Sequence, residues 1–199
     1  VHIAHISTPG EIDLIRSYKE QGVSITSEVA PHHLLLCDDD YDQLGPFLKV
    51  NPPVRSRQEV EQLKRYLQSG YIDAVATDHA PHTVTEKSGI YTKALSGGPL
   101  VQHALSAILE LYHRGKISLE KIAEKMSHHV ADIYKIKERG YIREGYYADL
   151  VLVDLNSTWK VGPHNLLSKC MWSPFENVQF KSKISNTFVN GHLVYNNGV

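Results

Sequence analysis

The chain has 199 residues, of which 42% are hydrophobic and 22% are charged, and its formal net charge is −1. These values are typical of a folded globular protein and exclude a disordered one. The near-neutral charge argues against binding to nucleic acid or to an anionic membrane, and no apolar run approaches the ~20 residues that span a bilayer. Cys37 and Cys170 are far apart and lack metal-ligand spacing, so we expect free thiols in a reducing cytoplasm.

Residues 1–78 alternate between short apolar strands and capped helices. After a first strand, Thr8 occupies a helix N-cap position and Glu11 completes a capping box. A second strand covers residues 23–30. Ser56 and Glu59 then begin another helix, and a third strand runs over residues 71–78. This order of strands and helices predicts a parallel sheet built from βαβ units.

The remainder of the chain changes from helical to β-rich. Helical patterns cover roughly residues 100–114, 119–128 and 130–136, and β-like segments cover residues 148–155, 183–189 and 192–197. The pair Asn190-Gly191 between the last two β-like segments predicts a two-residue hairpin. We therefore divide the chain into an α/β region over residues 1–140 and a β-rich tail over residues 141–199.

Three parallel strands alone leave two bare sheet edges and cannot close a barrel. The chain also starts without a methionine, inside a predicted strand. We therefore expect it to be the last part of a larger α/β fold. The bare edges predict association, either with the absent segment or as a homo-oligomer.

Titratable side chains lie at the carboxyl end of every predicted strand, where α/β proteins build their ligand sites. They are His5 after the first strand, Glu28, His32 and His33 at the second, and Asp78, His79 and His82 after the third. Strand periodicity places His2 and His5 on opposite faces, so only His5 can face a common site.

An imidazole and a carboxylate are typical ligands of catalytic zinc, which makes hydroxide available at neutral pH. A carboxylate beside that water can accept and transfer its proton. This chemistry fits His5 and Asp78. The local pattern is equally compatible with a histidine bound to a backbone carbonyl and with an aspartate that forms a turn.

Four motifs, in this order and at these separations, identify a family resemblance: "HIAHIST", "EVAPHHLLL", "KVNPPVRS" and "ATDHAPH". Together they resemble the dihydroorotases, specifically the longer-chain class of the amidohydrolase superfamily, over nearly the whole chain. Allantoinases and hydantoinases are near relatives, but the Asn51-Pro52-Pro53 and Asp78-to-His82 motifs resemble dihydroorotases more closely. The resemblance implies strands six to eight of a (β/α)₈ TIM-type barrel. It also implies that the tail "GYIREGYYADLVLVDL" enters a small β-sandwich.

The same resemblance implies a role for individual residues. His5 would bind one metal ion, and Asp78 would bind a second metal ion and act as general acid and base. Asn51 and His82 would hydrogen-bond the substrate. The backbone near Gly97 and Gly98 would contact the substrate ring, although "ALSGGPLVQH" departs from the family's usual loop.

Two further residues, Glu28 and His33, match positions that bind an additional metal in some relatives. That extra site needs a cysteine where this chain has Ala4, so we expect Glu28 and His33 to support the site rather than bind metal. We assign no role to His32.

The reaction implied is the reversible hydrolysis of dihydroorotate to N-carbamoyl-L-aspartate in pyrimidine biosynthesis, with two zinc ions as cofactor. The expected partners are the small-molecule substrate and other copies of the protein. The family's HxH pair, bridging carboxylate or carboxylated lysine, further histidine and substrate-binding arginine are absent from these 199 residues. We therefore expect this chain alone to be inactive. Two alternatives stay open: a catalytically dead scaffold of a pyrimidine-pathway complex, and another cyclic amidohydrolase such as an allantoinase.

Overall fold

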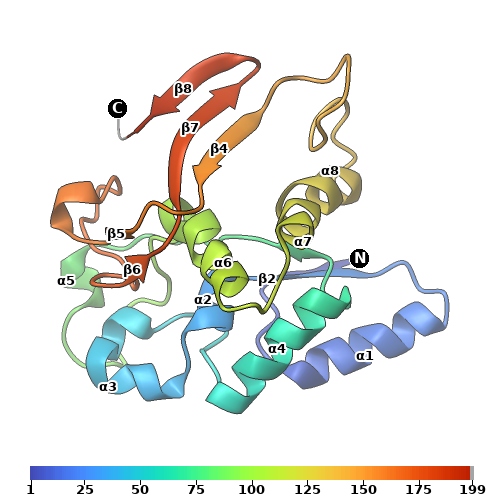
Figure 1. The fold of residues 1–199 in the computed structure, drawn as a ribbon. Coiled ribbons are helices and arrows are strands. Elements are labelled where there is room, and N and C mark those ends of the chain that lie inside the picture. Colours follow the sequence, from blue (N-terminus) through green and yellow to red (C-terminus); the bar gives the residue numbers. More distant parts are fainter. Residues whose placement is uncertain (198–199) are drawn as a thin grey trace.

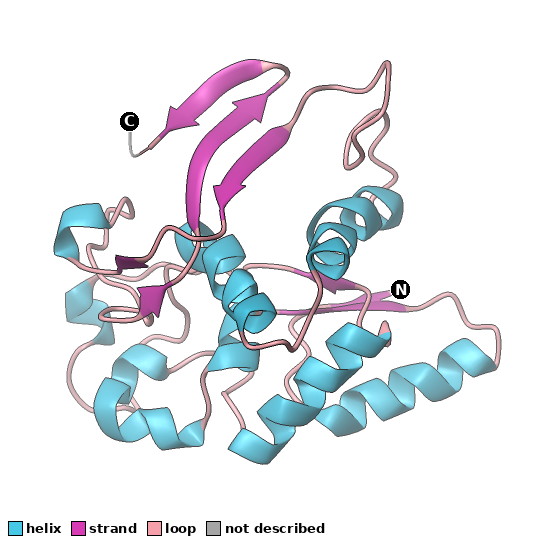
Figure 2. Cartoon of the chain, viewed as in Figure 1, coloured by secondary structure: helices cyan, strands magenta, loops and turns pink. Residues whose placement is uncertain are grey.

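A computed structural model describes residues 1–197 and contains three small sheets; most helices lie around the parallel sheet, and the antiparallel sheet of β4, β7 and β8 projects from them (Figures 1 and 2). The strands are β1 (His2–Ile3), β2 (Thr26–Val29), β3 (Ala74–Val75), β4 (Leu150–Asp154), β5 (Trp159–Lys160), β6 (Gln179–Phe180), β7 (Lys183–Val189) and β8 (His192–Asn196). The α-helices are α1 (Pro9–Glu20), α2 (Pro31–Leu35), α3 (Tyr41–Leu44), α4 (Arg57–Ser69), α5 (Val84–Lys87), α6 (Ala104–His113), α7 (Leu119–Ala123) and α8 (His129–Ile133). Short 3₁₀ segments cover Asp38–Asp40, Gly45–Leu48, Val101–His103 and Pro163–Asn165, and a π-helix covers Glu124–His128. No helix within residues 1–197 is long and apolar enough to cross a membrane.

The predicted parallel sheet is confirmed, with β2 between β1 and β3. Its regular strands are shorter than predicted, but single hydrogen bonds extend the pairing beyond them. The Ile6 amide donates to the Glu28 carbonyl at 2.8 Å, and the Ala76 amide donates to the Val29 carbonyl at 3.1 Å. The carboxyl ends of β1 and β3 therefore lie on either side of the carboxyl end of β2.

Both predicted capping boxes are present and fix where α1 and α4 begin. The Thr8 hydroxyl accepts from the Glu11 amide, and the Glu11 carboxylate accepts from the Thr8 amide at 2.7 Å. Ser56 and Glu59 repeat this arrangement at α4, which ends at Gly70 with a φ of 90°. The region between β2 and α4, for which the sequence predicted no helix, contains α2, α3 and two 3₁₀ turns. These helices are too short to produce a periodic apolar pattern.

The main core lies between the parallel sheet and the helices that connect its strands. Ile12 of α1 and Leu63 of α4 are fully buried and belong to the same cluster as Val29 of β2. Burial of each such side chain stabilises the fold by about 1.5–3 kcal/mol. The packing holds the sheet in place and leaves the polar strand ends at its rim.

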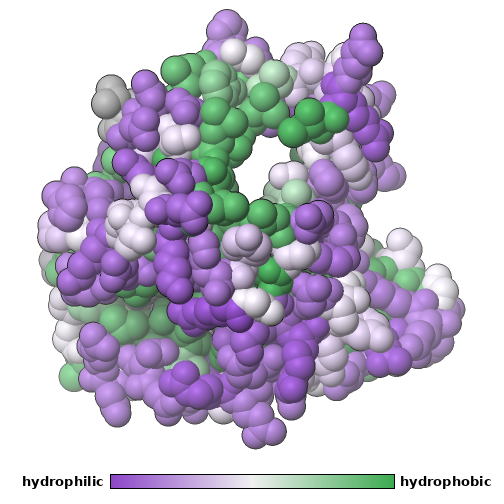
Figure 3. All heavy atoms as spheres, in the orientation of Figure 1, coloured by the Kyte–Doolittle hydropathy of each residue, from purple (hydrophilic) through white to green (hydrophobic). Residues whose placement is uncertain are grey.

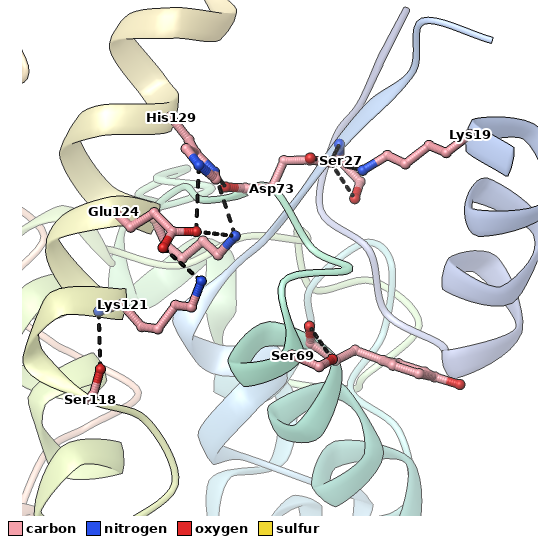
Figure 4. Close-up of polar contacts among 10 residues, drawn as sticks. Lys19, Ser27, Ser69, Asp73, Ser118, Lys121, Glu124 and His129 are labelled. Carbon is pink, nitrogen blue, oxygen red and sulfur yellow. Dashed lines mark hydrogen bonds and ion pairs between the residues drawn. The ribbon is translucent and has the colours of Figure 1, made fainter. Parts of the chain in front are cut away.

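A separate polar network fixes the amino end of β3 (Figure 4). The Asp73 carboxylate accepts hydrogen bonds from the Lys19 ammonium at 2.7 Å and from the Ser27 amide at 2.8 Å. The Asp73 carbonyl accepts from the His129 ring at 2.8 Å. These bonds connect β3 with α1, β2 and α8 at the end of the strand away from Asp78.

The tail contains the predicted antiparallel strands β4, β7 and β8, in the order β4-β7-β8. The hairpin at Asn190-Gly191 is confirmed, and both residues have positive φ, 53° and 79°, as a type I′ turn requires. Hydrophobic side chains gather on this sheet (Figure 3), and Leu152 and Leu193 are both 50% exposed. The two-residue strands β5 and β6 were not predicted, because such short segments carry no measurable alternation. The division at residue 140 stays a prediction.

Candidate functional site

The candidate site lies at the carboxyl end of the parallel sheet, where His5 and Asp78 follow β1 and β3. Both residues have left-handed backbones, with φ values of 41° and 48°. This conformation is uncommon outside glycine and concentrates at functional sites. The two residues follow the outer strands of the sheet, on either side of β2. The structure therefore brings the two predicted metal ligands to one rim of the sheet.

The Asp78 carboxyl group is electrostatically linked to both neighbouring strands. Burial raises its pKa above the usual range, the nearby Glu28 carboxylate raises it further, and His5 lowers it. Glu28 is itself held by His2, whose Nε2 lies 3.0 Å from the Glu28 Oε2 atom. His2 therefore reaches the same carboxylate that acts on Asp78, so it is connected to the site through Glu28. The expectation that His2 and His5 face opposite sides of the sheet stays a prediction.

The structure also places His32 in this site, a residue for which sequence reasoning found no role. Its side chain is 1% exposed, and neither ring nitrogen has a hydrogen-bond partner within residues 1–197. Its Nε2 atom lies 3.8 Å from the Asp78 Oδ2 atom, slightly beyond hydrogen-bond distance. Burial, followed by the neighbouring His33 and His5, holds the pKa of His32 well below its usual range, so its ring is neutral at pH 7.

His33 lies beside His32 but has a different partner. Its Nε2 atom is 2.9 Å from the Pro52 carbonyl, and burial lowers its pKa to about 4. The neutral ring therefore donates to that carbonyl. This bond ties α2 to the segment containing Asn51, which is exposed and precedes a cis peptide bond to Pro52.

The three remaining predicted substrate residues lie close together. The His82 Nε2 atom is 2.9 Å from the Ser96 carbonyl, directly before Gly97 and Gly98. The Ala80 amide donates to the Gly98 carbonyl at 3.0 Å, and a parallel bridge joins His79 to Gly98. The segment after β3 and the glycine loop therefore run side by side.

The His79 ring binds the backbone that follows the glycine loop. Its Nδ1 atom accepts hydrogen bonds from the amides of Leu100 and Val101 at 3.0 and 3.2 Å. His79 thus supports the turn that leads into α6.

The donor chemistry of His5, Asp78 and the unpartnered His32 fits a metal ion, because imidazole nitrogens and carboxylate oxygens are the ligands that zinc prefers. The residues do not form a complete ligand set by themselves. Within residues 1–197, three ligand atoms within 4.8 Å of one another occur only in the mostly exposed trio Cys37, Asp38 and Asp39. Neither His5 nor Asp78 lines the cleft formed by His79, Trp159, His164 and Tyr195.

Comparisons with known proteins place this rim in a family. The amidohydrolase family model matches residues 1–194. A dihydroorotase of Ehrlichia canis is 38% identical over 194 residues, 98% of this chain and 43% of that protein. A dihydroorotase of Halobacterium salinarum is 43% identical over 176 residues, 88% of this chain and 40% of that protein.

A solved structure is also similar to this chain over its whole length. The L-hydantoinase (dihydropyrimidinase) of Arthrobacter aurescens, of the TIM-barrel superfamily, superimposes with a TM-score of 0.96 at 30% identity and covers 100% of this chain and 45% of that protein. The chain therefore spans less than half the length of the relatives it matches. Since the sequence match extends over both the histidine and aspartate strand ends, the chain belongs to the amidohydrolase family.

Proposed function

We propose that this chain is part of a dihydroorotase, the enzyme that reversibly hydrolyses dihydroorotate to N-carbamoyl-L-aspartate. The observation that carries the proposal is the position of His5 and Asp78, both with positive φ, after the strands on either side of β2. The similarity to proteins named dihydroorotase supports the choice of substrate. We assign residues 1–140 to strands six to eight of the barrel and residues 141–199 to a small β-sandwich. The exposed apolar side chains of β4 and β8 support the second assignment.

Membership of the amidohydrolase family implies a metal cofactor, for which we propose two zinc ions. His5 would bind one ion and Asp78 the other, together with ligands from outside these 199 residues. When bound, such metals supply Lewis-acid chemistry by polarising a carbonyl and lowering the pKa of water to ~7.

The residues of the chain would then transfer the proton and hold the ring. Asp78 would accept the proton of the attacking water and deliver it to the departing ring nitrogen. Asn51 and His82 would hydrogen-bond the substrate, and the backbone at Gly97 and Gly98 would contact its ring. Glu28 and His33 would support the site through His2 and Pro52, their observed partners.

Turnover by the full-length protein, as its gene encodes it, tests this proposal. We expect hydrolysis of dihydroorotate, and a loss of about 10²–10⁴-fold in kcat on Asp78→Asn, the usual contribution of a general acid or base. The control Asp42→Asn changes an exposed carboxylate and should retain normal turnover. Residues 1–199 with added zinc should show no turnover. Enzyme-like rates from residues 1–199, or an active Asp78→Asn variant, would contradict the assigned roles.

A second candidate is a hydrolase of another cyclic amide, favoured by the superposition with L-hydantoinase. A substrate panel of dihydroorotate, hydantoin, dihydrouracil and allantoin separates the two. Preference for a ring without a carboxylate would favour this second candidate. A protein with no turnover of any of them would instead support a catalytically inactive scaffold. We further propose that the protein is cytoplasmic and forms a homo-oligomer. Light scattering of the purified protein would test the oligomeric state.

A further inference from the structure

Lys87, the last residue of α5, is a fully buried lysine outside the proposed catalytic groups. It is 0% exposed. Two other buried lysines each have a carboxylate partner: Lys64 lies 2.6 Å from Glu61, and Lys125 lies 3.1 Å from Glu124. Within residues 1–197, Lys87 has no such partner. Lysine is almost never fully buried without one, so its position needs a specific explanation.

Two backbone carbonyls and an aromatic face surround the Lys87 ammonium group. Its Nζ atom donates to the Lys49 carbonyl at 2.8 Å and to the Leu95 carbonyl at 2.9 Å. It also lies 5.6 Å from the centre of the Trp172 ring. Burial, and then the charge of Lys49, lower the pKa of Lys87 to about 8. The two carbonyls and the indole offset only part of the cost of burying the ammonium group.

These contacts join the loops that carry the proposed substrate residues. Lys49 lies two residues before Asn51, and Leu95 lies two residues before Gly97. The Gly97 amide donates to the same Lys49 carbonyl at 2.9 Å. One ammonium group and one carbonyl therefore hold the Asn51 loop against the glycine loop.

The indole next to Lys87 extends the connection to a third element. The Trp172 Nε1 atom donates to the His82 carbonyl at 2.7 Å. All three proposed substrate-binding segments thus meet around the Lys87 side chain, which touches none of the proposed catalytic atoms.

We propose that Lys87 is a positioning residue that sets the distance between the Asn51 loop and the Gly97 loop, and so shapes the substrate-binding side of the site. The identity of the substrate in this proposal rests on the proposed function. Removal of the two hydrogen bonds would separate the loops and weaken substrate binding, while His5 and Asp78 would stay in place.

Lys87→Met and Lys87→Gln form a matched pair for the test in the full-length protein. Their side chains have equal length, but only glutamine can donate hydrogen bonds to the two carbonyls. For Lys87→Met we expect KM for dihydroorotate to rise about tenfold, the loss of roughly one hydrogen bond from a charged donor. We expect a smaller change in kcat and an unchanged metal content. In Lys87→Gln, most of this rise in KM should be absent. The exposed Lys93→Met is the control and should match the wild type.

Hydrogen exchange of the Gly97 amide measures loop order without any substrate, so it tests the positioning role even if the protein does not turn over dihydroorotate. Exchange should be faster in Lys87→Met than in Lys87→Gln and unchanged in Lys93→Met. If Lys87→Met does not fold, Lys87→Gln is compared with the wild type, and its shorter side chain should still raise KM and speed exchange. Equal KM and equal exchange in Lys87→Met and Lys87→Gln would overturn the proposal; if Lys87→Met does not fold, equal KM and equal exchange in the wild type and Lys87→Gln would overturn it.

Discussion

Replacement of Gly97 by alanine should disrupt the contact between the glycine loop and the segment after β3. Gly97 has a φ of 128°, a conformation that side chains with a Cβ atom rarely adopt. An added Cβ would lie 2.6 Å from the Ala80 carbonyl oxygen and 2.7 Å from the Ala80 Cβ. Neither atom is the far end of a flexible side chain, so the two segments would have to move apart.

The expected cost follows from two contributions. Backbone strain of this kind costs about 1–3 kcal/mol. Separation of the segments would also weaken the hydrogen bond from the Ala80 amide to the Gly98 carbonyl, now 3.0 Å long, at a net cost of about 0.5–1.5 kcal/mol. We therefore expect Gly97→Ala to lower the free energy of unfolding by roughly 2–4 kcal/mol.

Urea unfolding of the full-length protein at a fixed metal concentration measures this change, because metal binding itself contributes to stability. Gly98→Ala is the matched control: the added Cβ would meet only Trp172, Leu100 and Pro174, at 3.7–3.9 Å, which is ordinary contact. Gly98→Ala should therefore change the unfolding free energy by less than about 1 kcal/mol. Equal unfolding midpoints for the two variants would refute the assignment of strain to Gly97.

Three further predictions concern the support of the site. Asp73→Ala should lower the free energy of unfolding by about 1.5–3 kcal/mol in urea, whereas Asp39→Ala, which breaks an exposed pair with Arg57, should cost at most about 1 kcal/mol. Burial alone would raise the pKa of Glu11, but hydrogen bonds from Thr8 and Ser7 lower it overall. The ionised Glu11 therefore stabilises the fold above its ordinary pKa of 4.5, and this stabilisation is lost as the pH falls through the lowered value. Glu11→Gln should flatten the dependence of stability on acid pH and lower the free energy of unfolding by about 1 kcal/mol at pH 7. A chelator should lower the Tm of the wild-type full-length protein more than that of its His5→Ala variant, as scanning calorimetry would measure.

The helices that carry local start and stop signals could be predicted from the sequence. The capping boxes at Thr8 and Ser56 involve residues three positions apart, so the pattern contains the whole interaction. The Asn190-Gly191 hairpin is local for the same reason. The helices of four or five residues between β2 and α4 carry no periodic signal, and tertiary packing determines them.

The candidate site could be predicted only in part. The positions of His5 and Asp78 followed from the rule that ligands gather at the carboxyl ends of parallel strands, but their left-handed backbones did not. His32 was missed because its role depends on Asp78, which is distant in the sequence. Burial of both His32 ring nitrogens without a partner is a property of the folded chain. In the sequence, only the adjacent pair His32-His33 pointed to it.

Lys87 shows why the support of a site is harder to predict than its ligands. The sequence before it, Thr83 to Glu86, contains a capping box and suggests a short surface helix whose last lysine faces solvent. The carbonyls that bury Lys87 come from residues 49 and 95, and a carbonyl has no residue-specific signature. A positioning residue held by backbone groups therefore becomes visible only after the fold is known, whereas ligands such as His5 and Asp78 can be recognised by their residue type. For this reason the unpaired buried charge, and not the motif, led to the role we propose for Lys87.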